Sequence, residues 1–187
     1  QEPGRMFEPF EGDRPRRDVP SWFGSMVIRD AQQSDADALG VLAAERDGGD
    51  PAERADSFRR ALSTDSGGAA SGLIVADTPD GIAGYGAFMR LCPSDVPDWG
   101  EGPTGWYLTG LVVAPELRRL GIGSRLTQER LRRIAQQSNV AYYMSNVLNP
   151  VSIALHARLG FVEVAKGPRF AGVTFRGGVG VLFRADL

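Results

Sequence analysis

The stretch VVAPELRRLGIGSRL, residues 112–126, joins a run of β-branched residues to a helical pattern through paired arginines and two glycines. A helix N-terminus presents amides without intrahelical partners and carries about half a positive charge. Gly121 and Gly123 allow close backbone approach and positive φ angles. Successive amides from Arg118 to Ser124 are therefore predicted to cradle a pyrophosphate. A tight turn whose glycines serve packing alone is the alternative.

Two other phosphate-binding patterns do not fit this stretch. The pattern G-x-x-x-x-G-K-[ST] needs a lysine, but Gly123 is followed by Ser124 and Arg125. The dinucleotide pattern G-x-G-x-x-G fails because Leu126 stands where its third glycine belongs. A dinucleotide site also needs an acid for the ribose hydroxyls, and no Asp or Glu occurs between residues 130 and 162.

Length and composition exclude several classes of protein. With 187 residues the chain can form one domain with its own core. Its net charge of -2 gives no global field that favours nucleic acid or an anionic membrane. Cys92 and His156 are the only residues of their types, so neither an internal disulfide nor the usual zinc ligand set is expected, and no metal is predicted. No apolar run approaches the roughly 20 residues of a membrane span, and a cytoplasmic location is expected.

The first 25 residues differ from the rest in composition. They are rich in Pro, Gly and charge and show no sustained period, so residues 1–25 are interpreted as a flexible N-terminal extension that cloning could have added. In the alternative, the aromatic side chains of Phe7, Phe10, Trp22 and Phe23 anchor this arm to the domain or to a second subunit. Residues 26–187 are predicted to form a single domain.

From residue 26 onward the predicted order of elements is β-α-α-β-β-β-α-β-α-β-β. Hairpins and at least one βαβ crossover indicate an α+β (mixed α/β) class with about seven strands and about four helices. Local signals predict a Ser34 cap on the first helix, Pro51 in the first turn of the second, and a hairpin turn around residues 79–81. The third helix is expected to turn one side toward the core, made of Ile122, Leu126, Leu131, Ile134 and Ala135.

Two segments together resemble the GNAT family of N-acetyltransferases. The segment from residue 112 resembles the family's acyl-CoA-binding motif Q/R-x-x-G-x-G/A, matched by Arg118, Gly121 and Gly123. The segment NPVSIALHARLGF resembles the family's N-x-x-[AS]-x-x-L-Y-x-x-x-G-F, with matches at Asn149, Ser152, Leu155, Gly160 and Phe161. The two motifs occur in the correct order, separated by one predicted helix and one strand. The resemblance covers residues 26–187 and is sharpest over residues 108–161.

The resemblance implies where acetyl-CoA would bind in a central twisted mixed sheet. Acyl-CoA would lie where the strands YLTGLVV and YYMSNV splay apart, and Gly110 is a plausible bulge at that point. The pantetheine would pair with the backbone of the first strand around Leu111, Val112 and Val113. The pyrophosphate would bind the loop made of Arg118, Arg119, Leu120, Gly121, Ile122, Gly123 and Ser124.

Asn149 and Ser152 are expected to complete the cofactor site, and Asn149 is also a good N-cap before Pro150. His156 stands where many relatives carry the Tyr that protonates the departing thiolate. An imidazole could act as this acid, or it could be a packing residue. Tyr107 occupies the position of a Glu base found in some relatives, and we assign His156 and Tyr107 to catalysis without naming a base.

The resemblance implies an acetyl-CoA-dependent N-acetyltransferase that acts on the primary amine of a small molecule, such as an aminoglycoside or an amine metabolite. A protein or peptide N-acetyltransferase and a CoA-binding module without turnover are the alternatives. Acidic residues at Asp95, Asp98 and Glu101 slightly favour a cationic acceptor. The N-terminal arm and the last predicted strand, residues 178–187, offer surfaces for a homodimer.

Overall fold

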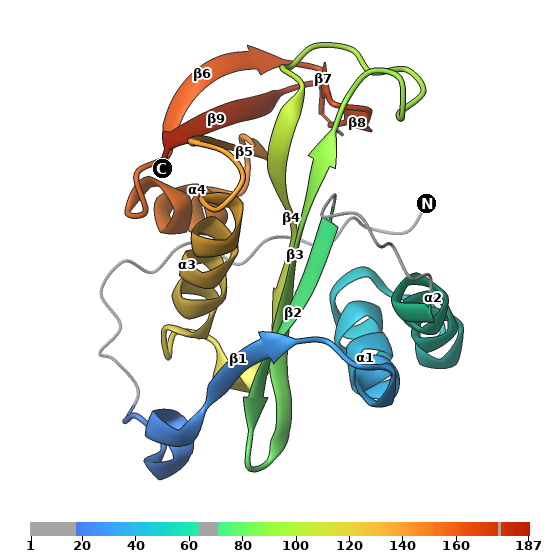
Figure 1. The fold of residues 1–187 in the computed structure, drawn as a ribbon, viewed down its shortest axis with the longest axis vertical. Coiled ribbons are helices and arrows are strands. Elements are labelled where there is room, and N and C mark those ends of the chain that lie inside the picture. The colour runs from blue at the N-terminus through green and yellow to red at the C-terminus, as the bar shows by residue number, and fades with distance from the viewer. Residues whose placement is uncertain (1–17, 64–70, 176) are drawn as a thin grey trace.

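The β-branched and aromatic runs of the sequence assemble into one sheet in the computed structural model, which describes residues 18–63, 71–175 and 177–187. The sheet order is β1-β2-β3-β4-β5-β9-β6 (Figure 1). Its strands are β1 (Val27–Asp30), β2 (Ser71–Thr78), β3 (Gly81–Leu91), β4 (Gly105–Val113), β5 (Val140–Asn146), β6 (Val162–Gly167) and β9 (Gly180–Asp186). A separate small ribbon pairs β7 (Arg169–Phe170) with β8 (Val173–Thr174).

One neighbouring pair of strands, β4 and β5, is parallel, and the other pairs of this sheet are antiparallel. The chain passes from β4 to β5 through α3, which is the predicted βαβ crossover. The helices are α1 (Ala36–Asp47), α2 (Pro51–Ser63), α3 (Ile122–Ile134) and α4 (Pro150–Ala157). The described residues therefore confirm the mixed α+β class, with a seven-stranded sheet and four α-helices.

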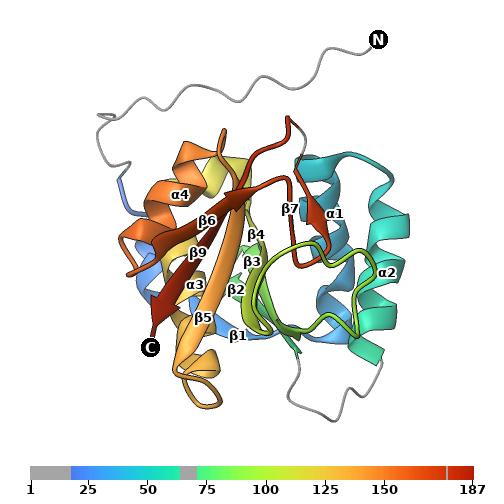
Figure 2. The same ribbon diagram turned by 90° about the horizontal axis from the view of Figure 1, so that it is seen from above.

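Helices cover both faces of the sheet (Figure 2). On one face α1 packs against β3 and β4, with α2 alongside α1, over a core that includes Leu39, Val75 and Val112. On the other face α3 lies across β1 to β5, and α4 lies beside it. The core beneath α3 includes Leu108 and Leu126. In the described part of the chain, no helix is long and apolar enough to cross a membrane.

The first helix begins differently from the prediction. A short 3₁₀ turn, Gln33–Asp35, precedes α1, and Ser34 makes no cap. The Asp35 carboxylate instead accepts the backbone N–H of Gln32 at 2.7 Å and the guanidinium of Arg29 at 2.8 Å. The Ser34 cap is therefore wrong, because the neighbouring carboxylate is the stronger acceptor and has a long-range cation beside it.

Other local predictions hold with small changes. Pro51 starts α2 as predicted, and the Asp50 carboxylate caps it by accepting the N–H groups of Ala52 and Glu53. The hairpin turn lies at residues 79–80, where Thr78 pairs with Gly81. Ala135 of the predicted core face of α3 is exposed, because the helix ends one residue earlier.

The chain just before β1 packs on the domain. A 3₁₀ turn, Ser21–Ser25, places Trp22 and Phe23 against the core beneath α3, as the alternative interpretation of this segment predicted. Phe7 and Phe10 lie outside the described residues. The boundary at residue 25 stays a prediction, but the aromatic pair belongs to the packed part of the chain.

The last strand does not offer the dimer surface that the sequence suggested. β9 lies inside the sheet, with β5 on one side and β6 on the other. Val181 and Leu182 of β9 are buried. The edge at this end of the sheet belongs to β6, so the prediction that the final strand presents a docking surface is wrong, and a homodimer stays a prediction without it.

Candidate active site

The site begins where β4 and β5 stop pairing. Their parallel register holds for three residue pairs and ends at Leu108 opposite Tyr143. From there β4 continues to Val113 and leads into α3, whereas β5 continues beside β9 (Figure 1). Backbone groups along the facing edge of a splayed strand need partners, and an extended ligand can supply them. We call the opening beyond the Leu108–Tyr143 pair the β4–β5 gap, and this pair its vertex.

A β-bulge in β4 sits beside the vertex, as predicted. In the pairing with β3, Gly86 lies opposite Leu111 and Ala87 lies opposite Thr109, so Gly110 is the extra residue. The bulge changes the alternation of side chains along β4. Leu111 and Val113 then pack on the α3 face with Leu108.

The backbone of β4 beyond the bulge is the part predicted to pair with pantetheine. Val112 turns its side chain into the core beneath α1, so a ligand in the gap could meet only its backbone. The carbonyl oxygen of Val113 accepts a hydrogen bond from Nε of Arg118 at 3.2 Å. The exposed Arg118 side chain would therefore have to release this carbonyl if pantetheine bonds to it.

The loop after β4 has the conformation that the glycines predict. Gly121 has a φ of 89° and caps α3, and Arg119 also has a positive φ of 69°. The hydrogen bond from the N–H of Arg125 to the carbonyl of Gly121 is the first of the helix, so the three amides before it, at residues 122–124, have no intrahelical acceptor. A Cβ built on Gly121 would meet nothing closer than Phe23 Cζ at 4.0 Å. The loop is open to a ligand.

The charges around this helix N-terminus favour an anion. The first turn of α3 has no acidic residue, and Arg118 and Arg119 are exposed just before it. Cations near the positive end of a helix dipole are unfavourable unless an anion lies between them. Arg125 is engaged elsewhere, with its guanidinium 5.4 Å from the centre of the Phe23 ring and 3.3 Å from the Phe23 carbonyl.

The second motif forms the start of α4 across the gap. Asn149 is the N-cap, and its side-chain oxygen accepts the N–H of Ser152 at 3.2 Å, which confirms the predicted cap with Pro150 at the first helical position. Leu155 of α4 lies 3.6 Å from a Cβ built on Gly123. The N-terminus of α3 and the side of α4 therefore approach each other beside β4, and the two sequence motifs meet in space.

The Ser152 hydroxyl is bonded to a tyrosine that the sequence analysis did not assign to the cofactor. Ser152 Oγ lies 2.5 Å from Tyr143 Oη. Burial raises the pKa of Tyr143 above its ordinary value, while hydrogen bonds to Ser145 and Ser152 and the charge of Arg130 act in the opposite direction. The phenol is therefore protonated at neutral pH.

His156 lies in the core behind this tyrosine. Only 2% of its surface is exposed, and its ring stacks on Tyr143 with centroids 3.6 Å apart and planes 3° apart. Its Nδ1 lies 2.8 Å from the carbonyl oxygen of Ser152, which can only accept, so Nδ1 carries the proton. Burial, with the nearby charge of Arg130, lowers the pKa of His156 to about 4. The imidazole is neutral at pH 7, and its buried Nε2 holds a lone pair with no partner among the described residues.

Tyr107 lies on the opposite face of the sheet. Its side chain is fully buried and packs with Phe170 and edge-on with Trp99. Its hydroxyl donates to the carbonyl of Pro103 at 2.7 Å, and burial raises its pKa. The structure thus places the two residues assigned to catalysis on different faces, His156 behind Tyr143 on the face of α3 and α4, and Tyr107 beneath the loop that enters β4.

A protein-family model matches the part of the sequence that forms most of this geometry. The model described as the acetyltransferase (GNAT) family matches residues 43–161, more than half of the chain. The chain belongs to the GNAT acetyltransferase family. Comparison of this GNAT sequence with curated proteins gives no match.

Solved structures share the fold of this GNAT domain at low sequence identity. A ribosomal-protein-alanine N-acetyltransferase from Brucella melitensis is 21% identical with a TM-score of 0.64, covering 86% of this chain and 99% of that one. A phosphinothricin acetyltransferase from Sinorhizobium meliloti, solved with acetyl-CoA, is 21% identical with a TM-score of 0.63, covering 87% and 88%. A spermidine N-acetyltransferase chimera from Vibrio cholerae is 15% identical with a TM-score of 0.65, covering 86% and 95%.

The sequence analysis missed a buried arginine at the site of this GNAT domain. Arg130 of α3 is 1% exposed, and its guanidinium bonds to the carbonyls of Ala87 at 3.0 Å and Thr109 at 2.8 Å and to the hydroxyl of Thr127 at 2.8 Å. The two carbonyls flank the Gly110 bulge. A signal was present, because position 130 continues the four-residue spacing of the buried positions 122, 126 and 134.

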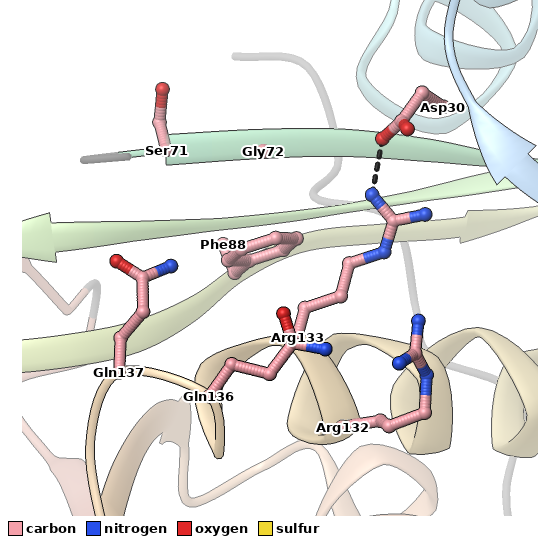
Figure 3. A pocket seen from close by; sticks show the side chains of 8 residues that line it. All are labelled: Asp30, Ser71, Gly72, Phe88, Arg132, Arg133, Gln136 and Gln137. Atoms are coloured by element: carbon pink, nitrogen blue, oxygen red, sulfur yellow. Dashed lines mark hydrogen bonds and ion pairs between the residues drawn. The ribbon is translucent and has the colours of Figure 1, made fainter. Parts of the chain in front are cut away.

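Another hollow on this GNAT domain lies away from the gap. A pocket of about 380 Å³ opens between the end of α3 and strands β1 to β3, with Phe88 at its floor and Arg133 reaching across to Asp30 (Figure 3). It contains none of the residues predicted for cofactor or catalysis. Among the described residues there is no group of three His, Cys, Asp or Glu side chains that could hold a metal ion.

Proposed function

We propose that this GNAT domain transfers the acetyl group of acetyl-CoA to the primary amine of a small molecule. The observation that carries the proposal is the end of β4–β5 pairing at Leu108 and Tyr143, from which β4 runs on to the loop that leads to the glycine-capped N-terminus of α3. A splayed strand edge and a free helix N-terminus on one continuous path suit a ligand with an extended arm and a pyrophosphate.

The proposed cofactor path runs along β4. The pantetheine arm would follow the backbone of Leu111, Val112 and Val113, and the pyrophosphate would meet the amides of Ile122, Gly123 and Ser124. Around these amides, Arg118, Arg119, Leu120 and Gly121 would complete the loop. Across the gap, Asn149 and Ser152 would contact the arm from the first turn of α4. A Cβ on Gly123 would lie 3.6 to 3.9 Å from Leu155, Leu111 and Val113, so this glycine keeps the path narrow but open.

The proposed reaction is direct acyl transfer. A neutral amine attacks the thioester carbonyl, the carbon–sulfur bond breaks, and the nitrogen loses a proton. The products are an N-acetyl amide and CoA. The nine residues of β4, all described, include no Asp or Glu, so the proton from nitrogen is expected to leave through water.

A cationic acceptor is supported by the loop that enters β4. Asp95, Asp98 and Glu101 are exposed there, a few residues before the vertex. Exposed carboxylates of one sign near a site raise the local concentration of a cationic substrate by steering. Asp98 has Arg169 4.0 Å away, too distant and exposed for a strong pair.

A screen for CoA release tests this proposal. Purified protein is mixed with acetyl-CoA and with aminoglycosides, polyamines, amino acids or peptides, and the free thiol is measured. We expect release with at least one small cationic amine and binding of acetyl-CoA by calorimetry. Release with peptides alone would favour a peptide N-acetyltransferase. Binding without release by any amine would favour a CoA-binding module, and no binding would overturn the proposal.

A further inference from the structure

The end of the β4–β5 gap defines where a bound thioester would lie, provided that the proposed function holds. An arm that enters from the α3 N-terminus along β4 can advance only to the vertex, because there Leu108 and Tyr143 belong to the paired part of the two strands. The reacting end of the arm would therefore stop beside this pair. A thiolate that leaves at this point is stabilised if a donor gives it a proton.

His156 is poorly suited to donate that proton. A donor must carry hydrogen on the atom that faces sulfur, but the hydrogen of the neutral ring is on Nδ1 and is used by the Ser152 carbonyl. The other ring nitrogen, Nε2, has only a lone pair in this tautomer. With a pKa of about 4, the ring is doubly protonated in less than about one molecule in a hundred at neutral pH.

Tyr143 carries a hydroxyl proton at the vertex itself. It is the β5 residue of the last β4–β5 pair, and its side chain points to the first turn of α4, where its Oη meets Ser152 Oγ at 2.5 Å. Asn149, proposed to contact the cofactor arm, caps that same turn. The phenol therefore lies between the strand that guides the arm and the helix that borders it.

The surroundings of Tyr143 hold its ring and keep the phenol protonated until sulfur needs the proton. The ring is stacked between His156 at 3.6 Å and Phe183 at 5.5 Å, which limits its movement. Burial raises the pKa of Tyr143, and the hydroxyl groups of Ser145 and Ser152 and the positive charge of Arg130 offset part of that rise. Arg130 stays charged at pH 7, because burial lowers its pKa only to about 9.

We propose that Tyr143, and not His156, is the catalytic acid of this domain, and that His156 is a positioning residue that holds the Tyr143 ring. As the carbon–sulfur bond breaks, the electron pair goes to sulfur and the Tyr143 hydroxyl proton moves to the thiolate to give CoA thiol. Ser152 donates its hydroxyl hydrogen bond to the resulting phenolate. Water then returns a proton to Tyr143, and the proton lost by the amine balances it.

Steady-state kinetics with hydroxylamine as the probe amine test this assignment. Tyr143→Phe should lower kcat by about 10² to 10⁴, the usual range for general acid catalysis, with acetyl-CoA affinity changed less than about threefold. The matched control is Tyr142→Phe, the neighbouring tyrosine on the other face, which should keep kcat. His156→Phe retains a flat ring against Tyr143 but loses the hydrogen bond to the Ser152 carbonyl, so its kcat should fall by about tenfold or less, short of the loss in Tyr143→Phe. If Tyr143→Phe keeps kcat while His156→Phe loses it, the assignment is overturned in favour of His156.

A binding measurement tests the same contact without any acceptor. Calorimetry at pH 7 and pH 9 compares CoA with desulfo-CoA. In the wild-type protein CoA affinity should rise relative to desulfo-CoA as the thiol ionises, because the phenol donates to the thiolate. Tyr143→Phe should remove this rise. A rise of equal size in Tyr143→Phe would overturn the assignment even if hydroxylamine is not a substrate. Failure of the wild-type protein to bind CoA at all would instead overturn the proposed function, and this assignment with it.

Discussion

The two faces of the sheet bury different kinds of side chain. Beneath α1 and α2, the core cluster is made of aliphatic residues with one phenol, that of Tyr85, and the buried Tyr107 hydroxyl and Asp35 carboxylate elsewhere on this side have hydrogen-bond partners. Beneath α3 and α4, the core also encloses Thr127, Arg130, Ser145 and His156. Arg130 makes no ion pair with any described carboxylate. Arg130 Nε and His156 Nε2 are buried and have no hydrogen-bond partner among the described residues.

This difference matters because buried polar groups are costly. An unsatisfied buried donor or acceptor costs about 1 to 3 kcal/mol, and an unpaired buried charge costs more. The face beneath α1 avoids this cost and serves stability. The face beneath α3 and α4 carries this cost near the vertex of the β4–β5 gap, where we place the chemistry. Polar groups there can donate a proton or hold a catalytic side chain, which aliphatic side chains cannot do.

The largest expected effect is a loss of stability at low pH that arises at His156, on the face of α3 and α4. The pKa of His156 is about 4 in the fold and about 6.5 in the unfolded chain, so the unfolded state takes up the proton first as the pH falls. Stability should be unaffected above pH 6.5 and should fall by about 3 kcal/mol between pH 6.5 and pH 4. Urea unfolding at pH 7.5 and 4.5 measures this. His156→Phe should lack this part of the acid loss. If the wild-type protein and His156→Phe lose the same free energy of unfolding between these two pH values, His156 is not a buried neutral imidazole.

Next in size is a change at the gap itself. Gly123→Val should lower acetyl-CoA affinity at least tenfold, about 1.4 kcal/mol, because the added methyl groups would enter the space bordered by Leu111 and Leu155. Gly123 is a cleaner target than Gly121, whose φ of 89° would strain any branched residue. Calorimetry measures the affinity, and Ala135→Val at the exposed end of α3 is the control. Unchanged affinity in a folded Gly123→Val protein would remove the proposed cofactor path.

Replacement of the buried cation should affect binding more than stability. Arg130→Met leaves the carbonyls of Ala87 and Thr109 without their donor, but it also removes a desolvated guanidinium, and these two effects oppose each other. The bulge at Gly110 should loosen, and acetyl-CoA affinity should fall by about tenfold, or 1.4 kcal/mol. Arg132→Met, exposed on the same helix, is the matched control. Equal affinities for the two variants would show that Arg130 does not shape the gap.

The smallest effect is expected at the edge of the other face. Asp35→Asn weakens the hydrogen bonds to Arg29 and to the turn before α1, so the free energy of unfolding should fall by about 1 kcal/mol. Acetyl-CoA affinity should not change, because Asp35 lies far along the chain and sheet from β4. Urea unfolding and calorimetry on the same preparations measure both quantities. A loss of acetyl-CoA affinity in Asp35→Asn would contradict the assignment of binding to the face of α3 and α4 alone.

Much of the fold and part of the site could be predicted because the signals are local. Alternating and helical periods predicted seven strands and four helices, and glycine predicted the bulge at Gly110 and the positive φ at Gly121. The Asn149 cap followed from one residue and its neighbour Pro150. Each of these features depends on backbone sterics or on hydrogen bonds within a few residues, which the sequence states directly.

The remaining features depend on residues that are distant in sequence. Arg29 on β1 decides that Asp35, and not Ser34, accepts the hydrogen bonds before α1. β9 is an interior strand because β6 pairs beside it. The sequence could name His156 as the histidine at the second motif, but not its protonation state, which follows from burial against Tyr143 and Phe161.

The sequence by itself therefore determined the family, the class of fold and the turns that open the gap. Only the tertiary structure decided which polar groups are dehydrated there: Arg130 without a carboxylate among the described residues, His156 without a charge, and Tyr143 at the vertex. The physical reason is that conformational preferences act along the chain, whereas desolvation depends on every atom that excludes water from a group, and those atoms come from β3, β4, β5, α3 and α4 together.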